Sequence, residues 1–203
     1  MPLLKLATQL QLERCPHCGV DRPNLSRVAH FETNDHQGAM PRIWSAYSCA
    51  RCGGVTFGWM RKQDGNAEAR ALYPTPQEVD EAIPERAKDY LSQALNSVNA
   101  PAGAVMLTAS AVDAMLKAKG YAEGSLYSRI DKAATDHVIT ADMALWAHEV
   151  RLDANDQRHA DAAASLPTID DARHTIAFAV ALGQFMFVLP SQVRRGIKDA
   201  KRS

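Results

Sequence analysis

The sequence predicts a mainly α-helical protein that begins with a small β-rich module. All four cysteines lie within the first 52 residues, in two Cys-x-x-Cys pairs. Apolar residues recur with helical spacing from about residue 85 to residue 190. A polar, proline-containing segment at 61–84 separates the two patterns, so we expect it to be the linker between two domains.

The composition is typical of a globular protein: of the 203 residues, 46% are apolar and 23% are charged. Low-complexity disorder, collagen and coiled coil are excluded on that ground. The most apolar stretch, 176–189, is shorter than the roughly 20 residues that a membrane-spanning helix needs. The N-terminal segment also lacks the pattern of a signal peptide. We therefore expect a cytoplasmic protein with no membrane partner.

The formal net charge is zero, but it is unevenly distributed. Residues 1–73 carry a net charge of +3, residues 74–189 carry −7, and residues 190–203 carry +4. An acidic middle segment is poorly suited to a phosphate backbone, so a nucleic acid would have to contact the flanks or a local patch. The basic C-terminal tail at 191–203 has a simpler interpretation as a solvated helix end, whose cations suit the helix dipole.

The cysteine pairs are Cys15/Cys18 and Cys49/Cys52, and a glycine follows each pair. Two tight turns of this kind can present four thiolates to one tetrahedral Zn²⁺ at about 2.3 Å. Two disulfides are disfavoured in an intracellular protein, and a redox motif needs only one pair in a βαβ context. We predict one structural zinc ion per chain, with no open coordination position for catalysis.

Short strands are predicted around the pairs, at 27–33, 43–48 and 54–59, which makes residues 1–60 a zinc ribbon. Three histidines in this region could replace a cysteine ligand, but four thiolates already complete the shell, so we expect them at the surface. They are His17, His30 and His36.

Four aromatic residues of the ribbon allow two interpretations. They could form a face for bases or for a peptide, or they could form the small core of the ribbon or its packing surface on the next domain. We favour the second, because a small module needs its aromatic side chains inside. The four are Trp44, Tyr47, Phe57 and Trp59.

Five helices are predicted in residues 85–190. The first carries an apolar stripe from Ala87 to Val98, and the second runs from Pro101 towards Gly120. The third spans 126–134 after Ser125, and the fourth begins near Thr140. The last begins at Thr168, in a Thr-x-x-Asp capping pattern with Asp171, and runs to about Leu189, where Pro190 ends or kinks it. Five such helices would form an all-α bundle.

The fourth helix carries an unusual arrangement of polar residues. We expect a core stripe on one side and a polar row beside it, with Leu145 and Leu152 just beyond the row. If the helix persists to residue 159, this pattern is typical of a cleft or a subunit interface. The alternative is that Asn155 and Asp156 end the helix. The stripe is Met143, Trp146, Ala147 and Val150, and the row is His148, Arg151, Asn155 and His159.

These features resemble the prokaryotic domain of unknown function 4145 family. The resemblance covers residues 72–190 and is carried by Leu-Tyr-Pro at 72–74, the helix containing Ala94, the helix at 101–120, and above all the run 151–159. The family hallmark is an arginine, then a Gly-Asn step, then a histidine. Here Ala154 replaces the glycine, whereas Asn155 and His159 match. An N-terminal zinc ribbon is a common companion of this domain.

The family is similar to the HEPN superfamily, which implies a HEPN-like bundle of about five helices at 85–190. It also implies a homodimer whose arginine and histidine rows meet at the interface. Many HEPN domains are metal-independent endoribonucleases. In that chemistry His159 would transfer a proton while a ribose 2′-hydroxyl attacks its own phosphate, Arg151 would stabilise the phosphorane, and Asn155 would position one of them. The separation of Arg151 and His159 exceeds that of the usual motif. We set Arg158 aside, because it points away from its neighbour His159.

Two functions follow as expectations. The first is an effector that acts on RNA in prokaryotic defence or stress response, as a metal-independent endoribonuclease in its strongest form. The second is a non-catalytic dimeric adaptor that binds a protein or a nucleic acid through the ribbon. The acidic helical domain favours the adaptor, and the row Arg151, Asn155 and His159 favours the enzyme. The sequence holds no glycine-rich phosphate loop, HExxH or GxSxG motif.

Overall fold

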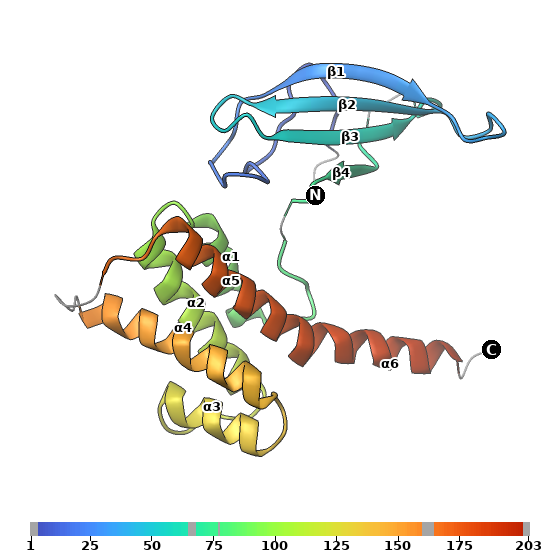
Figure 1. The fold of residues 1–203 in the computed structure, drawn as a ribbon. Helices are drawn as coiled ribbons and strands as arrows, with labels where there is room; N and C mark the ends of the chain where they lie inside the picture. Colours follow the sequence, from blue (N-terminus) through green and yellow to red (C-terminus); the bar gives the residue numbers. More distant parts are fainter. Residues whose placement is uncertain (1–3, 65–67, 77, 160–164, 201–203) are drawn as a thin grey trace. The chain divides into compact units, whose positions relative to one another are not determined.

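The chain divides into two compact units, Met1–Gln77 and Glu78–Ser203, and each is described by itself. The computed structural model describes residues 4–64, 68–76, 78–159 and 165–200 (Figure 1). The chain is mainly helical with one small antiparallel sheet, as predicted. The boundary between the units falls inside the proline-containing segment 61–84.

The first unit contains a four-stranded antiparallel sheet in the order β1-β2-β3-β4 (Figure 1). Its strands are β1 (Leu25–Thr33), β2 (Arg42–Cys49), β3 (Val55–Arg61) and β4 (Ala71–Tyr73). The first three match the predicted strands. The fourth lies in the segment expected to be a linker. It pairs with β3, and Tyr73 of β4 lies opposite Phe57 of β3. Three residues are too few for strand alternation to stand out in a polar sequence, which is why the pattern did not reveal β4.

One face of this sheet carries the core of the first unit. Tyr47 is completely buried there, and its hydroxyl donates a hydrogen bond to the carbonyl oxygen of Ala7 at 2.9 Å. Because side chains alternate along a strand, the neighbours of Tyr47 on β2 point to the opposite face. The core residues are Leu6, Leu10, Cys15, Leu25, Tyr47, Cys49 and Leu72.

The second unit is a helical bundle with its own core. Its helices are α1 (Glu85–Asn96), α2 (Pro101–Ala118), α3 (Leu126–Thr135), α4 (Ala141–His159), α5 (Ile169–Gly183), the π-helical turn η1 (Gln184–Val188) and α6 (Leu189–Ala200). Helix α2 is the central element, since it packs against α1, α3, α4 and α5. Elements α5, η1 and α6 are continuous, so the described residues form the five predicted rods (Figure 1).

The predicted start of the last helix is confirmed, and of the two alternatives for Pro190 the one in which it ends the helix is wrong. Thr168 accepts a hydrogen bond from the backbone of Asp171, whose carboxylate accepts one from the backbone of Thr168. The helix does not stop near Leu189 and continues to Ala200. In the π-helical turn the N–H of Leu189 bonds five residues back, to Gln184, and this wider turn accommodates Pro190, which has no N–H to donate. Residues 191–200 of the expected tail are therefore helical, and 201–203 lie outside the described residues.

By length and composition alone, the continuous helix Ile169–Ala200 is apolar enough to cross a membrane, with a mean hydropathy of 1.7 over its best window. This is weak evidence for a span, because the core helix of a globular domain passes the same test. Part of this helix packs inside the bundle, where Phe178, Ala179 and Leu182 are buried.

Candidate functional site

The four cysteines form one cluster in the first unit. All four Sγ atoms lie within 4.8 Å of one another, and those of Cys15 and Cys52 are 3.9 Å apart. A tetrahedron of thiolates around Zn²⁺, with bonds of about 2.3 Å, has edges of about 3.8 Å. The cluster therefore fits the donor set and the dimensions of a metal site.

The two cysteine turns share one backbone geometry. In the first, the N–H of Gly19 donates to the carbonyl oxygen of Cys15 at 2.9 Å, and in the second, Gly53 donates to Cys49 at 2.8 Å. Both glycines have a positive φ, of 69° and 71°, which glycine adopts without strain. The two turns with this shared geometry bring their four Sγ atoms together in one cluster.

The pKa values of the clustered cysteines shift in opposite directions. Burial raises the pKa of Cys15 to about 12, against the effect of the Cys18 backbone N–H that donates to its sulfur. Burial also acts to raise the pKa of Cys49, but donation from the Cys52 backbone N–H and from neighbouring groups outweighs it, and the pKa falls to about 7. One thiol thus ionises near neutral pH, and a bound divalent cation would displace the remaining protons.

His17, the first of the three ribbon histidines, packs beside the thiol cluster and is not one of the four clustered metal-binding groups. Its Nε2 lies 2.9 Å from the carbonyl oxygen of Val55. Its ring crosses Gly54, where an added Cβ would lie 2.5 Å from the ring. This contact joins the first cysteine turn to the strand that follows the second turn. A glycine at 54 is what permits so close an approach.

The other two histidines also lie away from the thiols. Nδ1 of His30 is 3.1 Å from Oγ of Ser45, and His36 is exposed. In the described part of the chain, the metal-binding group that includes the cysteines contains only the four thiols.

The expected position in the core of the ribbon holds for one of the four predicted aromatic residues, and packing of the others against the next domain stays a prediction. Only Tyr47 enters the core; Trp44, Phe57 and Trp59 lie on the opposite face of the sheet. Trp44 is the centre of a cluster with one ring from each strand. Its ring centroid lies 6.5 Å from that of Phe31, 6.1 Å from that of Trp59 and 6.2 Å from that of Tyr73. We call these four rings the aromatic face.

The aromatic face is open on its own unit and carries positive charge. Phe31 and Tyr73 are 44% and 50% exposed. The guanidinium of Arg42 lies 4.4 Å above the ring of Trp59, and Arg61 is opposite Arg42 in the register. Both arginines and Trp59 line a small cavity of about 160 Å³. None of the residues that the register places on this face is acidic, within the described strands.

In the second unit, the first half of the α4 row packs against α3. The guanidinium of Arg151 lies 5.3 Å from the ring centroid of Tyr127, and its Nε is buried without a hydrogen-bond partner. The ring of His148 also lies against Tyr127, at 4.7 Å, and its Nε2 is 2.9 Å from a carboxylate oxygen of Asp131. These two side chains therefore have local packing roles within one subunit.

The second half of the row is exposed. The helix persists to His159, so the alternative that it ends at Asn155 is wrong. Among the described residues, neither Asn155 nor His159 makes a side-chain hydrogen bond. At 1.5 Å per residue, Arg151 and His159 are about 12 Å apart along the helix axis. Their backbone positions are therefore more than two helical turns apart within one chain.

The expected core stripe of α4 is shifted. Ala147 and Val150 are buried as predicted, together with Ala144 and Ala154, whereas Met143 is half-buried. Trp146 is 45% exposed, although its ring packs at 4.9 Å against that of Phe178. Three of the four buried residues of α4 are alanines, and helix periodicity alone does not reveal where small side chains form the contact.

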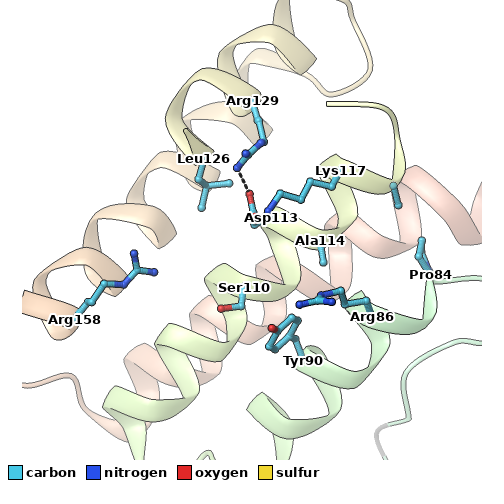
Figure 2. Close-up of a pocket in the computed structure, with 11 residues that line it drawn as sticks. Pro84, Arg86, Tyr90, Ser110, Asp113, Ala114, Lys117, Leu126, Arg129 and Arg158 are labelled. Carbon is cyan, nitrogen blue, oxygen red and sulfur yellow. Dashed lines mark hydrogen bonds and ion pairs between the residues drawn. The ribbon is translucent and has the colours of Figure 1, made fainter. Parts of the chain in front are cut away.

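Sequence reasoning missed a cavity in the helical unit and the part that Arg158 plays in it. Arg158 lies seven residues after Arg151, two helical turns on, and so on nearly the same side of α4. There it lines a cavity of about 500 Å³ together with residues of α1, α2 and α3 (Figure 2). The signal available in the sequence was the i, i+7 spacing of two arginines.

The comparison with family models found a match to Domain of unknown function (DUF4145) over residues 91–200. That range is just over half of the chain. The chain belongs to this family. The DUF4145 match starts inside α1 and extends through α6, ten residues beyond the end of the predicted resemblance at 190. No curated protein and no solved structure matched the chain.

Proposed function

We propose that this DUF4145 protein binds single-stranded RNA on the aromatic face of its ribbon. The observation that carries the proposal is the cluster of four rings, one from each strand, with a guanidinium stacked on one of them. Stacking of a base on an aromatic side chain contributes about 1–3 kcal/mol and tolerates any sequence. Arg42 and Arg61 would neutralise the phosphates that run between the stacked bases.

The thiol cluster supports this function by holding the ribbon together. We propose that Zn²⁺ occupies it, with one ion per chain, because Zn²⁺ favours four thiolates in a tetrahedral site. Cys49 ends β2 and Cys15 lies in the segment that covers the core face, so the ion would join the two. With all four positions filled by protein, its role would be structural.

The test is fluorescence anisotropy with a labelled single-stranded RNA and the Trp44→Ala variant. Loss of the central ring should weaken binding by about tenfold, since one base loses its stacking partner. Phe185→Ala, which removes an exposed ring of the helical unit, is the matched control and should bind like the wild type. Unchanged binding by Trp44→Ala with its zinc retained, or absence of binding by the wild type, would refute the proposal.

A second candidate is the metal-independent endoribonuclease that a HEPN-like bundle implies. It is supported by the exposure of Asn155 and His159 on the side of α4 that also carries Arg151. Because Arg151 and His159 are far apart along one helix, this activity requires a second subunit that completes the site. A non-catalytic adaptor needs no second subunit to complete a catalytic site. The open aromatic face can bind RNA within one chain, so we favour RNA binding without cleavage.

We also propose a homodimer formed through the helical unit. Exposed apolar side chains lie along two of its helices, and a second copy could cover both sets. On α4 they are Leu145 and Leu152, and on α6 they are Leu189, Val193 and Ile197. None of the described residues of α6 is buried by the unit itself. A role in prokaryotic defence or stress response is the setting that the family resemblance implies, and we propose a cytoplasmic location on the N-terminal sequence pattern.

A further inference from the structure

Helices α1 to α4 surround the cavity of about 500 Å³ in the second unit (Figure 2). Cavities that bind small organic ligands measure about 300–1,000 Å³. Part of the wall is apolar, formed by Pro84, Ala114 and Leu126. A cavity of this size and mixed lining suits an organic ligand better than it suits an inorganic ion.

The cavity concentrates positive charge in an acidic part of the chain. Residues 74–189 contain nine Lys or Arg and sixteen Asp or Glu. Four of the nine cationic side chains line the cavity, against one carboxylate. Like charges held together raise the energy of the free protein, and a bound anion would offset that energy. The four are Arg86, Lys117, Arg129 and Arg158.

Two of these cations are already paired. Asp113 lies 2.6 Å from Arg129 and 2.6 Å from Lys117, and Figure 2 shows the first of these contacts. The side chain of Arg129 is only 12% exposed, and its Nε is buried without a partner. Asp113 and Arg129 thus form a mostly buried part of the wall, whereas the side chain of Lys117 is 48% exposed.

The other two cations have no carboxylate partner among the described residues. Arg86 lies 5.8 Å from the ring centroid of Tyr90, on α1. Arg158 reaches the cavity from α4, across from Asp113 (Figure 2). Both guanidinium groups are free to form bidentate hydrogen bonds with phosphate oxygens.

We propose that this cavity binds a nucleoside phosphate. Arg86 and Arg158 contact the phosphate oxygens, and Arg129 adds positive charge from the wall. Tyr90 and the apolar wall cover the base and the sugar. This site goes beyond the proposed function, because it lies in the helical unit and involves no residue of the ribbon.

The test is isothermal titration calorimetry of the full chain with ADP. We expect saturable binding that weakens at least about tenfold in Arg158→Ala and in Arg86→Ala, since each loses a charged hydrogen bond. The matched control is Arg195→Ala, which removes an exposed arginine of α6 outside the cavity. Melting curves should show that all three variants remain folded.

Two further ligands identify the source of the nucleoside phosphate. A trinucleotide RNA with a 5′-phosphate is compared with its 5′-hydroxyl form, in the Trp44→Ala background to suppress binding by the ribbon. Arg158-dependent binding of the phosphorylated form alone, without ADP binding, assigns the site to RNA ends; binding of ADP assigns it to free nucleotides. The proposal would be overturned if neither ADP nor the phosphorylated RNA binds. It would also be overturned if inorganic pyrophosphate binds as well as ADP, or if neither arginine substitution weakens binding.

Discussion

The guanidinium of Arg151 lies 5.3 Å from the ring centroid of Tyr127, which anchors the α4 arginine to α3 of its own subunit. His159, the histidine paired with it in the proposed catalytic row, is exposed at the end of the same helix. Substitution of Arg151 should therefore lower the free energy of unfolding more than substitution of His159. This difference allows a structural role and a catalytic role to be separated.

Arg151→Ala should lower the free energy of unfolding by about 1 kcal/mol, since it removes a cation–π contact and half-buried packing. His159→Ala should change it by less than about 0.5 kcal/mol, because the side chain is exposed. Thermal melting and RNA cleavage are measured on the same samples. If the row is catalytic, His159→Ala abolishes cleavage with its melting temperature unchanged, and wild-type cleavage persists in EDTA with cyclic phosphate ends. Wild-type protein that binds RNA and leaves it intact would exclude the enzyme.

Protein purified without chelators should contain one zinc ion per chain, as measured by elemental analysis. Cys49→Ser should lose the ion and unfold the ribbon, because Cys49 is both a predicted ligand and a buried core residue. The helical unit should keep its cooperative melting transition, since its core contains no residue of the ribbon. Wild-type protein without stoichiometric metal would show that the thiols serve another purpose.

The capping box of α5 should make stability depend on pH. Hydrogen bonds from the backbone N–H and the hydroxyl of Thr168 lower the pKa of Asp171. The folded pKa is then below the unfolded one, so the stabilisation is complete above about pH 4 and is lost as the pH falls through the folded pKa. Urea unfolding at pH 7 should show Asp171→Asn less stable than wild type, with the gap narrowing as the pH falls below about 4. Thr168→Ala should cost about 1 kcal/mol at pH 7. A gap that does not change with pH would mean that the charge of Asp171 does not contribute.

Self-association should depend on exposed apolar residues of the helical unit. Multi-angle light scattering at micromolar concentration should give a dimer mass for wild type. Leu152→Glu and Ile197→Glu place a charge on α4 and on α6, and at least one should yield monomers. Arg173→Glu, on the exposed surface of α5, is the control and should remain dimeric. A wild-type monomer would also remove the composite site on which the endoribonuclease depends.

The sequence alone was enough to predict the cysteine cluster, five helical rods and the start of α5. Each depends on local spacing: two residues between paired cysteines, apolar residues every three to four positions, and a Thr-x-x-Asp pattern. Turns and helices are formed by residues this close in the sequence, so the spacing of residue types is enough to predict them. The family match over 91–200 was likewise anticipated from the resemblance, but both limits differ from the predicted 72–190, and the run at 72–74 lies outside the match.

Only the tertiary structure decided which side of each element is used. Trp44 and Tyr47 are both aromatic residues of β2, and the N-terminal segment that packs over the Tyr47 side leaves Trp44 on the open face. Arg86, Lys117, Arg129 and Arg158 are widely separated in the sequence, and the packing of four helices brings them to one cavity. Such contacts depend on which surfaces the folded chain buries against each other. The residues that burial brings together have no regular spacing in the sequence, so no sequence pattern predicts them.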